Sequence, residues 1–421
     1  MSFNSGLASF AARLRRRIIA CTDLPQRRRL QPWHSDTPQD LGLPERTFGS
    51  LPPAAGGDSR APVVGVACGQ ADIPVFDQLA LELFALQFER NAPYRRLCEA
   101  RGARPDTVAD WTEIPSAPTS AFKEFDLSCL PAGERTTVFH SSGTTGQQPS
   151  RHYHNAESLA LYATSLLQWF YAHCHSPLAN CPLVILTPQP AEAPRSSLAH
   201  MFDTIRCEAA QGESAFVGMA AEDGAWILDV ETALERLSTA SRAGQPVLML
   251  GTAFSFVHLL DHLADRHLRL ELPSGSCALE TGGYKGRSRS MPKAALHALI
   301  SQRLGIAPGH IVCEYGMSEL SSQAYDLVIR PPASGLVPLP RCFHFPPWAR
   351  AQIISPETGC EVAEGETGLI RVLDLANVRS VLAIQTEDLG VRRSNCFELL
   401  GRASAAEPRG CSLMSLEDLT L

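Results

Sequence analysis

The most informative segment of this sequence is Val138-Phe-His-Ser-Ser-Gly-Thr-Thr-Gly-Gln-Gln-Pro-Ser150. Within it, Ser141 to Gly146 hold four hydroxyl side chains and two glycines in six consecutive positions. Glycine lets backbone N–H groups turn toward an anion, and hydroxyls donate hydrogen bonds without adding charge. No Gly-Lys-Ser/Thr follows at the spacing of a Walker loop. The segment is therefore typical of a phosphate-holding loop of another kind, with a polar surface turn as the alternative.

Two further motifs follow this loop, each after a short apolar run. The first is Tyr315-Gly-Met-Ser-Glu319, which follows the run 311–313, and the second is Thr386-Glu-Asp-Leu-Gly390, which begins shortly after Ala383. Three motifs in this order and at these long spacings resemble the adenylate-forming superfamily, whose members activate carboxylic acids with ATP. The combination is more specific than any one of the motifs.

A narrower resemblance extends from about residue 73 to the C-terminus. The segments that carry it are Ala121-Phe-Lys123, Thr187-Pro188, Thr281-Gly-Gly-Tyr-Lys-Gly-Arg287, Gly401-Arg402 and Arg409-Gly-Cys-Ser-Leu413. They look like the acyl-protein synthetase (LuxE-type) branch of the superfamily. The resemblance implies an enzyme that adenylates a fatty acid and then carries the acyl group as a thioester on its own cysteine. It also implies a partner that takes the acyl group, such as an acyl reductase.

The resemblance further implies a nucleotide site. The phosphates of ATP would be wrapped by Ser141, Ser142, Gly143, Thr144, Thr145 and Gly146. Tyr315, followed by Gly316, would stack on adenine, with Gly282 and Gly283 allowing its close approach. Asp388 would bind the ribose hydroxyls, and Arg402 belongs to the Gly-Arg hinge beside the nucleotide. Glu319 would hold Mg²⁺, a hard cation that prefers carboxylate and phosphate oxygens.

Lysine is rare in this chain, which has 37 basic residues of which only Lys123, Lys285 and Lys293 are lysine. A lysine supplies a compact, rotatable point charge that arginine does not. Lys285 lies inside a motif and is the predicted catalytic cation that neutralises the attacking carboxylate or the acyl-adenylate. The wider superfamily ends its phosphate loop in lysine, whereas this chain has Ser150-Arg151, so Arg151 and Lys123 are the alternatives. Lys293, outside the motifs, is interpreted as incidental.

Cys411 is the predicted acyl acceptor, because it occupies the place of the acylated cysteine in the tail of the acyl-protein synthetases. A thiol reacts as its thiolate, and a nearby cation such as Arg409 raises the thiolate fraction. Three functions remain open at this point. The acyl group passes to Cys411; or it passes to coenzyme A or a carrier-protein pantetheine, with Cys411 structural; or the chain is a catalytically silent nucleotide-binding subunit of a multienzyme complex.

Apolar runs alternate with helical segments along the chain, which predicts an α/β fold with sheets covered on both faces. Buried strands are expected at 183–186, 215–217, 247–250 and 311–313, with helices at 157–172, 253–264 and 292–304. Shorter strands are expected after the proline-rich stretch 331–347, at 350–354, 368–373 and 396–400. The resemblance implies the large N-terminal-domain architecture of adenylate-forming enzymes, with layered α/β/α sheets and a small β-rich subdomain at about 341–400.

The predicted organisation has three parts. Residues 1–72 form a basic, flexible extension and linker, residues 73–400 the acyl-activating domain, and residues 401–421 a short tail that carries Cys411. Enzymes of the wider superfamily continue into a mobile C-terminal lid with a late lysine. Here only nineteen residues follow Arg402 and none is lysine. The lid is therefore expected to be truncated or absent.

The charge distribution is uneven within a net charge of −7. Residues 1–29 carry seven arginines and one acid, so the remainder is strongly acidic, which argues against nucleic-acid binding. Phe3, Leu7, Phe10, Leu14 and Ile18 recur at helical spacing, which indicates an amphipathic helix for a membrane surface or a partner. A disordered extension is the favoured alternative, and an organellar transit peptide is another.

Thirteen cysteines are present without any Cys-x-x-Cys pair. An odd count and several cysteines inside apolar runs predict reduced thiols in a cytoplasmic protein. Two histidine pairs, His152/His154 and His173/His175, raise the question of a metal site. Both pairs are expected on helices, where residues two apart point in different directions, so zinc is not favoured.

Overall fold

The computed structural model describes residues 5–22, 73–141, 148–174, 181–209, 213–222, 224–283, 291–326 and 341–403. The helices are α1 (Ser5–Thr22), α3 (Ile73–Arg90), α4 (Ala92–Ala100), α5 (Ala121–Glu124), α6 (Ala156–Cys174), α7 (Ser197–Ala209), α8 (Val230–Arg242), α9 (Ala253–Asp265) and α10 (Lys293–Leu304). The strands are β1 (Ala117–Pro118), β2 (Thr137–His140), β3 (Arg151–His154), β4 (Leu183–Ile185), β5 (Ser214–Phe216), β6 (Gly218–Ala220), β7 (Trp226–Leu228), β8 (Leu248–Thr252), β9 (Cys277–Thr281), β10 (Ile311–Tyr315), β11 (Ala324–Tyr325), β12 (Ala349–Ile354), β13 (Thr367–Asp374), β14 (Ala383–Arg393) and β15 (Cys396–Arg402).

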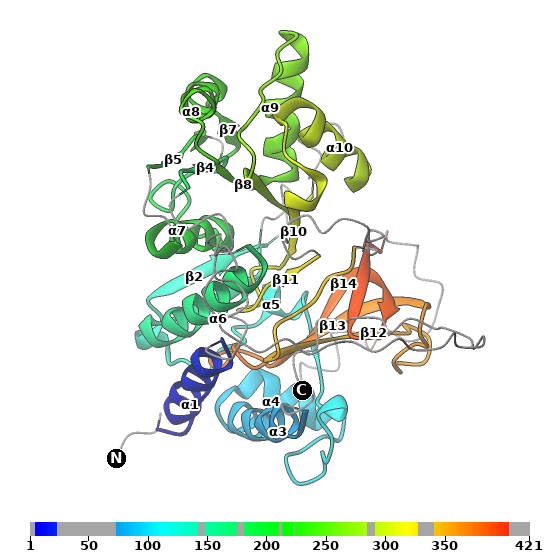
Figure 1. Cartoon of the computed structure of the whole chain (residues 1–421). Helices are drawn as coiled ribbons and strands as arrows, with labels where there is room; N and C mark the ends of the chain where they lie inside the picture. Colours follow the sequence, from blue (N-terminus) through cyan, green and yellow to red (C-terminus); the bar gives the residue numbers. More distant parts are fainter. Residues whose placement is uncertain are drawn as a thin grey trace, which may run out of the picture.

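The central sheet has six strands in the order β11-β10-β9-β8-β4-β5 (Figure 1). Five of them run parallel and β11 pairs antiparallel to β10 at the edge. Its inner strands β8, β9 and β10 are buried on both faces, which explains why they are mostly apolar in the sequence, with Glu280 and Glu314 as the charged exceptions. The carboxyl ends of β8, β9 and β10 therefore meet along one edge of the sheet.

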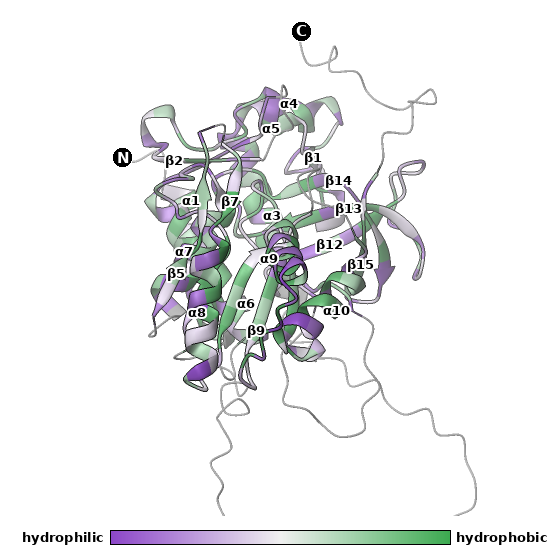
Figure 2. Cartoon of the chain, turned by 90° about the horizontal axis from the view of Figure 1, so that it is seen from above, coloured by the Kyte–Doolittle hydropathy of each residue, from purple (hydrophilic) through white to green (hydrophobic). Residues whose placement is uncertain are grey.

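Helices cover both faces of this sheet. Two consecutive residues of β4 point to opposite faces of the sheet. Val184 belongs to the apolar cluster that includes α8, α9 and α10, and Leu183 to the cluster that includes α6 and α7. Figure 2 shows the apolar residues of β9 in green and the polar residues of α8 in purple. The α/β fold with helices on both faces of a sheet is confirmed.

A second sheet has the order β1-β14-β13-β12, and β15 pairs with β14 (Figure 1). The pairings β12–β13, β13–β14 and β14–β15 are antiparallel. The short strand β1 adds to the other side of β14 in parallel, which ties residues 117–118 to the β-rich region. This sheet, α1, α3 and α4 share one apolar core.

The basic N-terminal segment does not match the expected flexible extension. Residues 5–22 form α1, which packs against α6 and α3, and Leu7, Phe10, Leu14 and Ile18 are buried in the core. Arg15 Nε on its polar side donates to Thr164 Oγ1 of α6 at 2.9 Å. The favoured interpretation of a disordered extension is therefore wrong for residues 5–22, and the amphipathic helix is present with its apolar face covered by the protein itself. Among the described residues, no helix is both long and apolar enough to cross a bilayer.

Replacing Phe10 with alanine is expected to lower the free energy of unfolding by about 3–5 kcal/mol, because the phenyl ring is fully buried between helices. Arg16→Ala on the exposed side of α1 is the matched control and is expected to change stability by less than about 0.5 kcal/mol. Urea unfolding of the two variants measures both values. Equal stability of the two would show that α1 is not part of the folded core.

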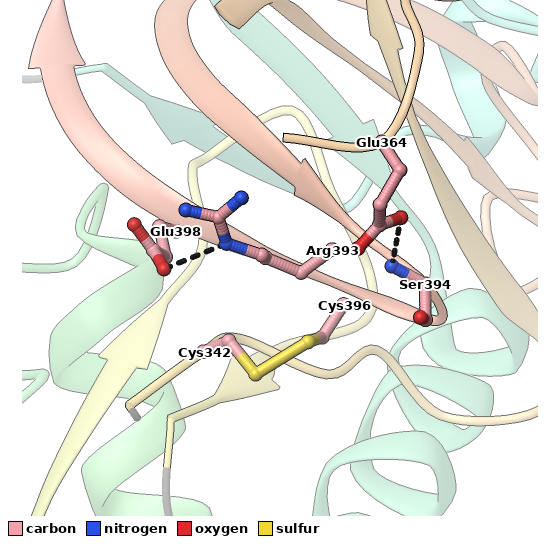
Figure 3. Close-up of a disulfide and its surroundings, with 6 residues drawn as sticks. All are labelled: Cys342, Glu364, Arg393, Ser394, Cys396 and Glu398. Carbon is pink, nitrogen blue, oxygen red and sulfur yellow. Dashed lines mark hydrogen bonds and ion pairs between the residues drawn. A yellow bond between two sulfur atoms is a disulfide. The ribbon is translucent and has the colours of Figure 1, made fainter. Parts of the chain in front are cut away.

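Two cysteines also depart from the prediction of reduced thiols. Phe343 N donates to Phe397 O at 2.8 Å and Phe397 N donates to Phe343 O at 3.2 Å, which forms a short antiparallel bridge. The preceding residues, Cys342 and Cys396, then lie with Cα atoms 5.7 Å apart and form a disulfide (Figure 3). That spacing is within the range a disulfide requires. The two cysteines are 54 positions apart in the sequence, so their spacing gave no indication that they pair.

Candidate active site

The carboxyl ends of β9 and β10 bring two of the sequence motifs together. The strands are parallel neighbours, and Thr281 at the end of β9 pairs with Glu314 of β10. Gly282 and Gly283 therefore follow β9 beside the Tyr315–Glu319 motif that follows β10. Gly282 has a φ of +69°, a conformation that favours glycine, and a Cβ at either glycine would meet no atom within 4 Å. The crevice beyond the carboxyl ends of parallel strands is where open α/β sheets bind ligands.

Tyr315 joins the third motif to this edge. Its hydroxyl donates to Asp388 Oδ2 on β14 at 2.9 Å, and its ring is buried among Phe343, Phe345 and Phe397 with centroid distances of 6.0, 6.2 and 5.4 Å. Burial raises the pKa of Asp388, and the hydrogen bond from Tyr315 works against that rise. Arg402 Nε approaches Asp388 Oδ1 at 3.8 Å from β15, and its side chain is exposed. The structure therefore brings Tyr315, Asp388 and Arg402 together.

The base of the Ser/Thr/Gly loop is fixed between β2 and β3. Ser141 N donates to Ser150 O at 3.2 Å, and Ser150 N donates to Ser141 Oγ at 2.9 Å. His152, the second residue of β3, has its Nδ1 at 2.8 Å from Ser318 O in the Tyr315–Glu319 motif. His152 thus links β3, which follows the Ser/Thr/Gly loop, to the Tyr315–Glu319 motif that follows β10. The predicted phosphate-binding residues Ser142, Gly143, Thr144, Thr145 and Gly146 lie outside the described residues, as do Lys285 and Cys411.

The interpretation of His152 and His154 as helical residues is wrong. Both lie on β3, where residues two apart face the same side, and their rings are 4.2 Å apart in the buried interior. His173 lies on α6, while His175 is outside the described residues. The four-residue run Arg151–His154 is short, and only its pairing with β2 makes it a strand. Burial lowers the pKa of His152 to about 4 and that of His154 well below its usual value, so both imidazoles are neutral.

The low pKa of His152 predicts a specific acid sensitivity. Because the folded-state pKa of about 4 lies below the usual 6.5, protons bind the unfolded chain more readily. The stabilising contribution is present above pH 6.5 and is lost as the pH falls toward 4. His152→Asn keeps a donor for Ser318 O without the titrating ring. We expect wild type to lose about 1–2 kcal/mol more than this variant between pH 7 and pH 5, by urea unfolding.

Comparison with the variant is necessary because two buried carboxyl groups act in the opposite direction. Desolvation raises the pKa of Glu314 to about 7 and that of Asp374 to about 6, so both favour the folded state as the pH falls. These contributions are common to wild type and variant and cancel in the difference. An identical pH dependence of the two proteins would show that His152 does not titrate as described.

Glu319 is held in a buried turn directly after the Tyr-Gly-Met-Ser sequence. The residue is 4 % exposed; its carboxylate accepts a hydrogen bond from Ser318 Oγ at 2.9 Å, and its backbone carbonyl accepts one from Asn377 Nδ2 at 2.9 Å. The following turn is fixed by Asp374, which accepts from the backbone N–H and the hydroxyl of Ser322 at 2.8 and 2.7 Å. Within the parts of the chain that are described, no basic side chain forms an ion pair with Glu319.

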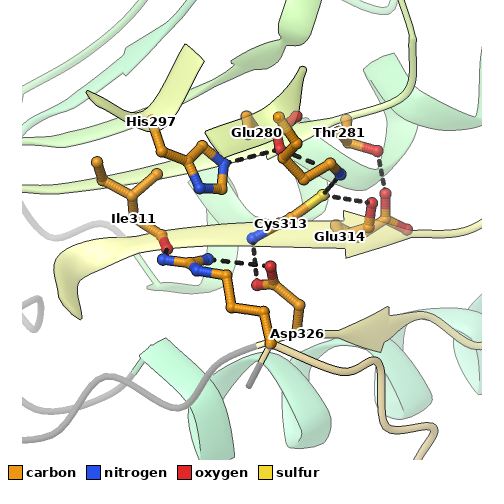
Figure 4. A network of polar contacts seen from close by, with 9 residues as sticks. Glu280, Thr281, His297, Ile311, Cys313, Glu314 and Asp326 are labelled. Carbon is orange, nitrogen blue, oxygen red and sulfur yellow. Dashed lines mark hydrogen bonds and ion pairs between the residues drawn. The ribbon is translucent and has the colours of Figure 1, made fainter. Parts of the chain in front are cut away.

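A buried polar network behind the β9–β10 edge was missed by sequence reasoning (Figure 4). Lys293, interpreted as incidental, contacts Cys313 Sγ and lies 3.3 Å from Glu280, whose carboxylate is also 3.0 Å from His297 Nε2. Burial works to raise the pKa of Glu280, but His297 and Lys293 lower it below its usual value. The neighbouring Glu314 accepts a hydrogen bond from Thr281. The signal that could have indicated this network is a glutamate within each of two otherwise apolar segments, Glu280 and Glu314.

The network borders a cavity of about 950 Å³ between α10 and β15. Lys293, His297, Asp326, Arg341, Phe343 and Glu398 are among its lining residues. Lys293 Nζ lies 5.4 Å from the Phe343 ring centroid, and Phe343 also packs against Tyr315. The cavity therefore reaches the aromatic residues that support the Tyr315–Asp388 pair.

The fold is that of solved adenylate-forming ligases. A solved 2-hydroxyisobutyryl-CoA ligase, in complex with 2-HIB-AMP and CoA in the thioesterification state, has the same fold, with a TM-score of 0.59. It is 14 % identical to this chain, and the match covers 82 % of this chain and 72 % of the ligase.

Sequence comparison narrows the class. The model of the acyl-protein synthetase (LuxE) family matches residues 67–420. Two relatives, the long-chain-fatty-acid–luciferin-component ligases of Vibrio harveyi and Aliivibrio fischeri, are each 22 % identical, over 352 and 354 residues. Each match covers 80 % of this chain and 86 % of the relative. The chain belongs to the acyl-protein synthetase (LuxE) family and is a ligase.

Proposed function

We propose that this enzyme activates a long-chain fatty acid with ATP and Mg²⁺ as acyl-AMP and then carries the acyl group as a thioester on Cys411. The observation that carries the adenylation step is the joining of the three motifs. His152 links the exit of the Ser/Thr/Gly loop to Ser318, and Tyr315 links the same motif to Asp388. The fatty acid is supported by the names of the two relatives, which are long-chain-fatty-acid ligases.

Adenylation joins two anions, so positioning and charge neutralisation supply most of the catalysis. A carboxylate oxygen of the acid attacks the α-phosphorus, and the bond to the pyrophosphate oxygen breaks. The loop from Ser141 to Gly146 would hold the β- and γ-phosphates, Tyr315 the adenine and Asp388 the ribose hydroxyls, with Gly282, Gly283 and Gly316 leaving room. Lys285 would neutralise the acid carboxylate, and Arg402 would approach the nucleotide from β15.

The described residues fit a magnesium ion at Glu319. Its carboxylate is buried and has only Ser318 Oγ as a described side-chain donor, so oxygen lone pairs remain for a hard cation. Bound there, Mg²⁺ would neutralise phosphate charge as pyrophosphate leaves. Glu319 would hold the ion, and the turn fixed by Asp374 would keep the carboxylate in place.

In the second step the Cys411 thiolate attacks the acyl carbon, the bond between that carbon and the AMP oxygen breaks, and AMP leaves. The thiol proton goes to solvent or to a base. The acyl group would then pass to a partner protein, such as an acyl reductase; the relatives are named as ligases that join a long-chain fatty acid to a luciferin component. This step rests on the family to which the chain belongs and on the place of Cys411 in the tail.

The test is incubation of the full chain with ATP, Mg²⁺ and fatty acids of different chain lengths, followed by pyrophosphate measurement and intact-protein mass spectrometry. Acid-dependent pyrophosphate release with a hydroxylamine-labile acyl adduct is the expected result. Pyrophosphate release without an adduct, with turnover restored by coenzyme A, would move the acceptor to an external thiol. No release with any acid would overturn the proposed adenylation.

A further inference from the structure

Cys342, His344 and Cys396 bring three metal-binding side chains together at the start of β15. Residues 342 and 344 are two apart in an extended segment and so face the same side, while Cys396 lies across the Phe343–Phe397 bridge. One ligand atom from each of the three residues lies within 4.8 Å of the other two. Backbone hydrogen bonds of 3.0 and 3.2 Å to Tyr325 fix the position of His344.

Two thiolates and an imidazole are a ligand set that zinc prefers, with bonds of about 2.3 Å to sulfur and about 2.0 Å to nitrogen. Three atoms that already lie within 4.8 Å of one another can surround such an ion with small side-chain rotations. His344 is exposed, so solvent can supply a fourth ligand. The absence of a Cys-x-x-Cys pair in the sequence does not exclude this site, because two of its ligands come from segments that meet only in the fold.

We propose that the reduced protein binds Zn²⁺ through Cys342, His344 and Cys396, with water completing a tetrahedral site. The disulfide is the oxidised form of the same site (Figure 3). A dithiol reductant supplies two electrons and two protons, which convert the disulfide to two thiols while the dithiol becomes a disulfide. Zn²⁺ then displaces the two thiol protons and forms two Zn–S bonds and one Zn–N bond.

The location gives this site a consequence for the enzyme. Cys342 and Cys396 directly precede Phe343 and Phe397, whose rings stack at 5.5 Å and pack against Tyr315. In the oxidised protein the disulfide ties these two segments together. Zinc ties the same segments when the disulfide is reduced, so the aromatic support of Tyr315 is kept in both states.

The test uses the full chain, reduced with a phosphine, incubated with Zn²⁺ and desalted before elemental analysis. Stoichiometric zinc is expected in wild type and in Cys360→Ser, whose exposed cysteine lies outside the site, and loss of it in Cys342→Ser and Cys396→Ser. Titration against a chromogenic chelator is expected to show affinity weaker by at least about 10-fold in His344→Ala, since the loss of an outer-shell partner alone already costs about that much. Co²⁺ in place of zinc should give a thiolate-to-metal absorption band in wild type and no such band in the cysteine variants.

Reduced wild-type protein that retains no zinc would overturn the proposal. Zinc retained in full by Cys342→Ser and Cys396→Ser would place the metal elsewhere and overturn it equally, and unchanged affinity in His344→Ala would remove His344 from the site. Circular dichroism of each apo variant confirms that metal loss is not loss of fold. Because metal content is measured without substrate, the result is independent of the proposed adenylation.

Discussion

Glu319→Gln is expected to lower kcat/KM for acid-dependent pyrophosphate release by about 10²–10³-fold. Glutamine has nearly the same shape and can still accept from Ser318 Oγ, so the turn after β10 is kept. The lost charge removes the carboxylate that would hold Mg²⁺ against the departing phosphates. Raising the Mg²⁺ concentration should recover part of the activity of the variant, because the neutral amide still offers one oxygen ligand. Pyrophosphate release at several Mg²⁺ concentrations measures both effects.

Glu99→Gln provides the matched control, because Glu99 is an exposed glutamate on α4, a helix that lies away from β9 and β10 (Figures 1 and 2). It should retain wild-type kcat/KM. Removing a buried charge that has no basic partner among the described residues should leave the unfolding midpoint of Glu319→Gln unchanged or raised. Wild-type activity of a folded Glu319→Gln protein would eliminate Glu319 as the magnesium ligand.

The fold was predictable where one physical signal was strong. Apolar runs such as residues 311–313 were predicted to be buried strands, and they are buried strands in a sheet covered on both faces. The strand β9 was not predicted, although Thr281-Gly-Gly was recognised as a motif, because Cys277-Ala-Leu-Glu-Thr281 contains a charge. That charge is Glu280, and its burial is supported by His297 and Lys293 from another element. The sequence pattern around Glu280 cannot show that Lys293 and His297, which are distant in the sequence, contact it in the folded protein.

The same reason accounts for the other differences. The helical pattern of α1 is local, but a disordered extension was favoured over the helix, because the pattern cannot show that α3 and α6 cover its apolar face. His152 and His154 lie on a strand because β2 pairs with them, and Cys342 meets Cys396 across a bridge between distant segments. Of the predicted site residues, Tyr315, Asp388 and Arg402 lie together, and the Tyr315–Asp388 hydrogen bond joins two of the motifs. The roles of the individual side chains remain predictions, as does the division of the chain into three parts.

Cys411→Ser is expected to abolish the hydroxylamine-labile acyl adduct completely. A serine hydroxyl without an activating base is a far weaker nucleophile than a partly ionised thiol, so the acyl group should remain on AMP. Adenylation itself does not use the thiol. The variant should therefore still release pyrophosphate in a burst of about one equivalent and then stop, because the bound acyl-AMP has no acceptor. Intact-protein mass spectrometry and a pyrophosphate time course measure the two outcomes.

The described cysteines supply the controls for this prediction. Burial raises the pKa of the Cys98, Cys129 and Cys277 thiols to about 12, which keeps them protonated and unreactive. Cys207 and Cys360 are exposed, and Arg206 Nη2 lies 3.2 Å from Cys207 Sγ, so Cys207 is the stronger rival as an acyl acceptor. Cys207→Ser and Cys360→Ser should both keep the adduct. If the adduct disappears in Cys207→Ser and persists in Cys411→Ser, the acyl group is carried on α7 and the tail has another role.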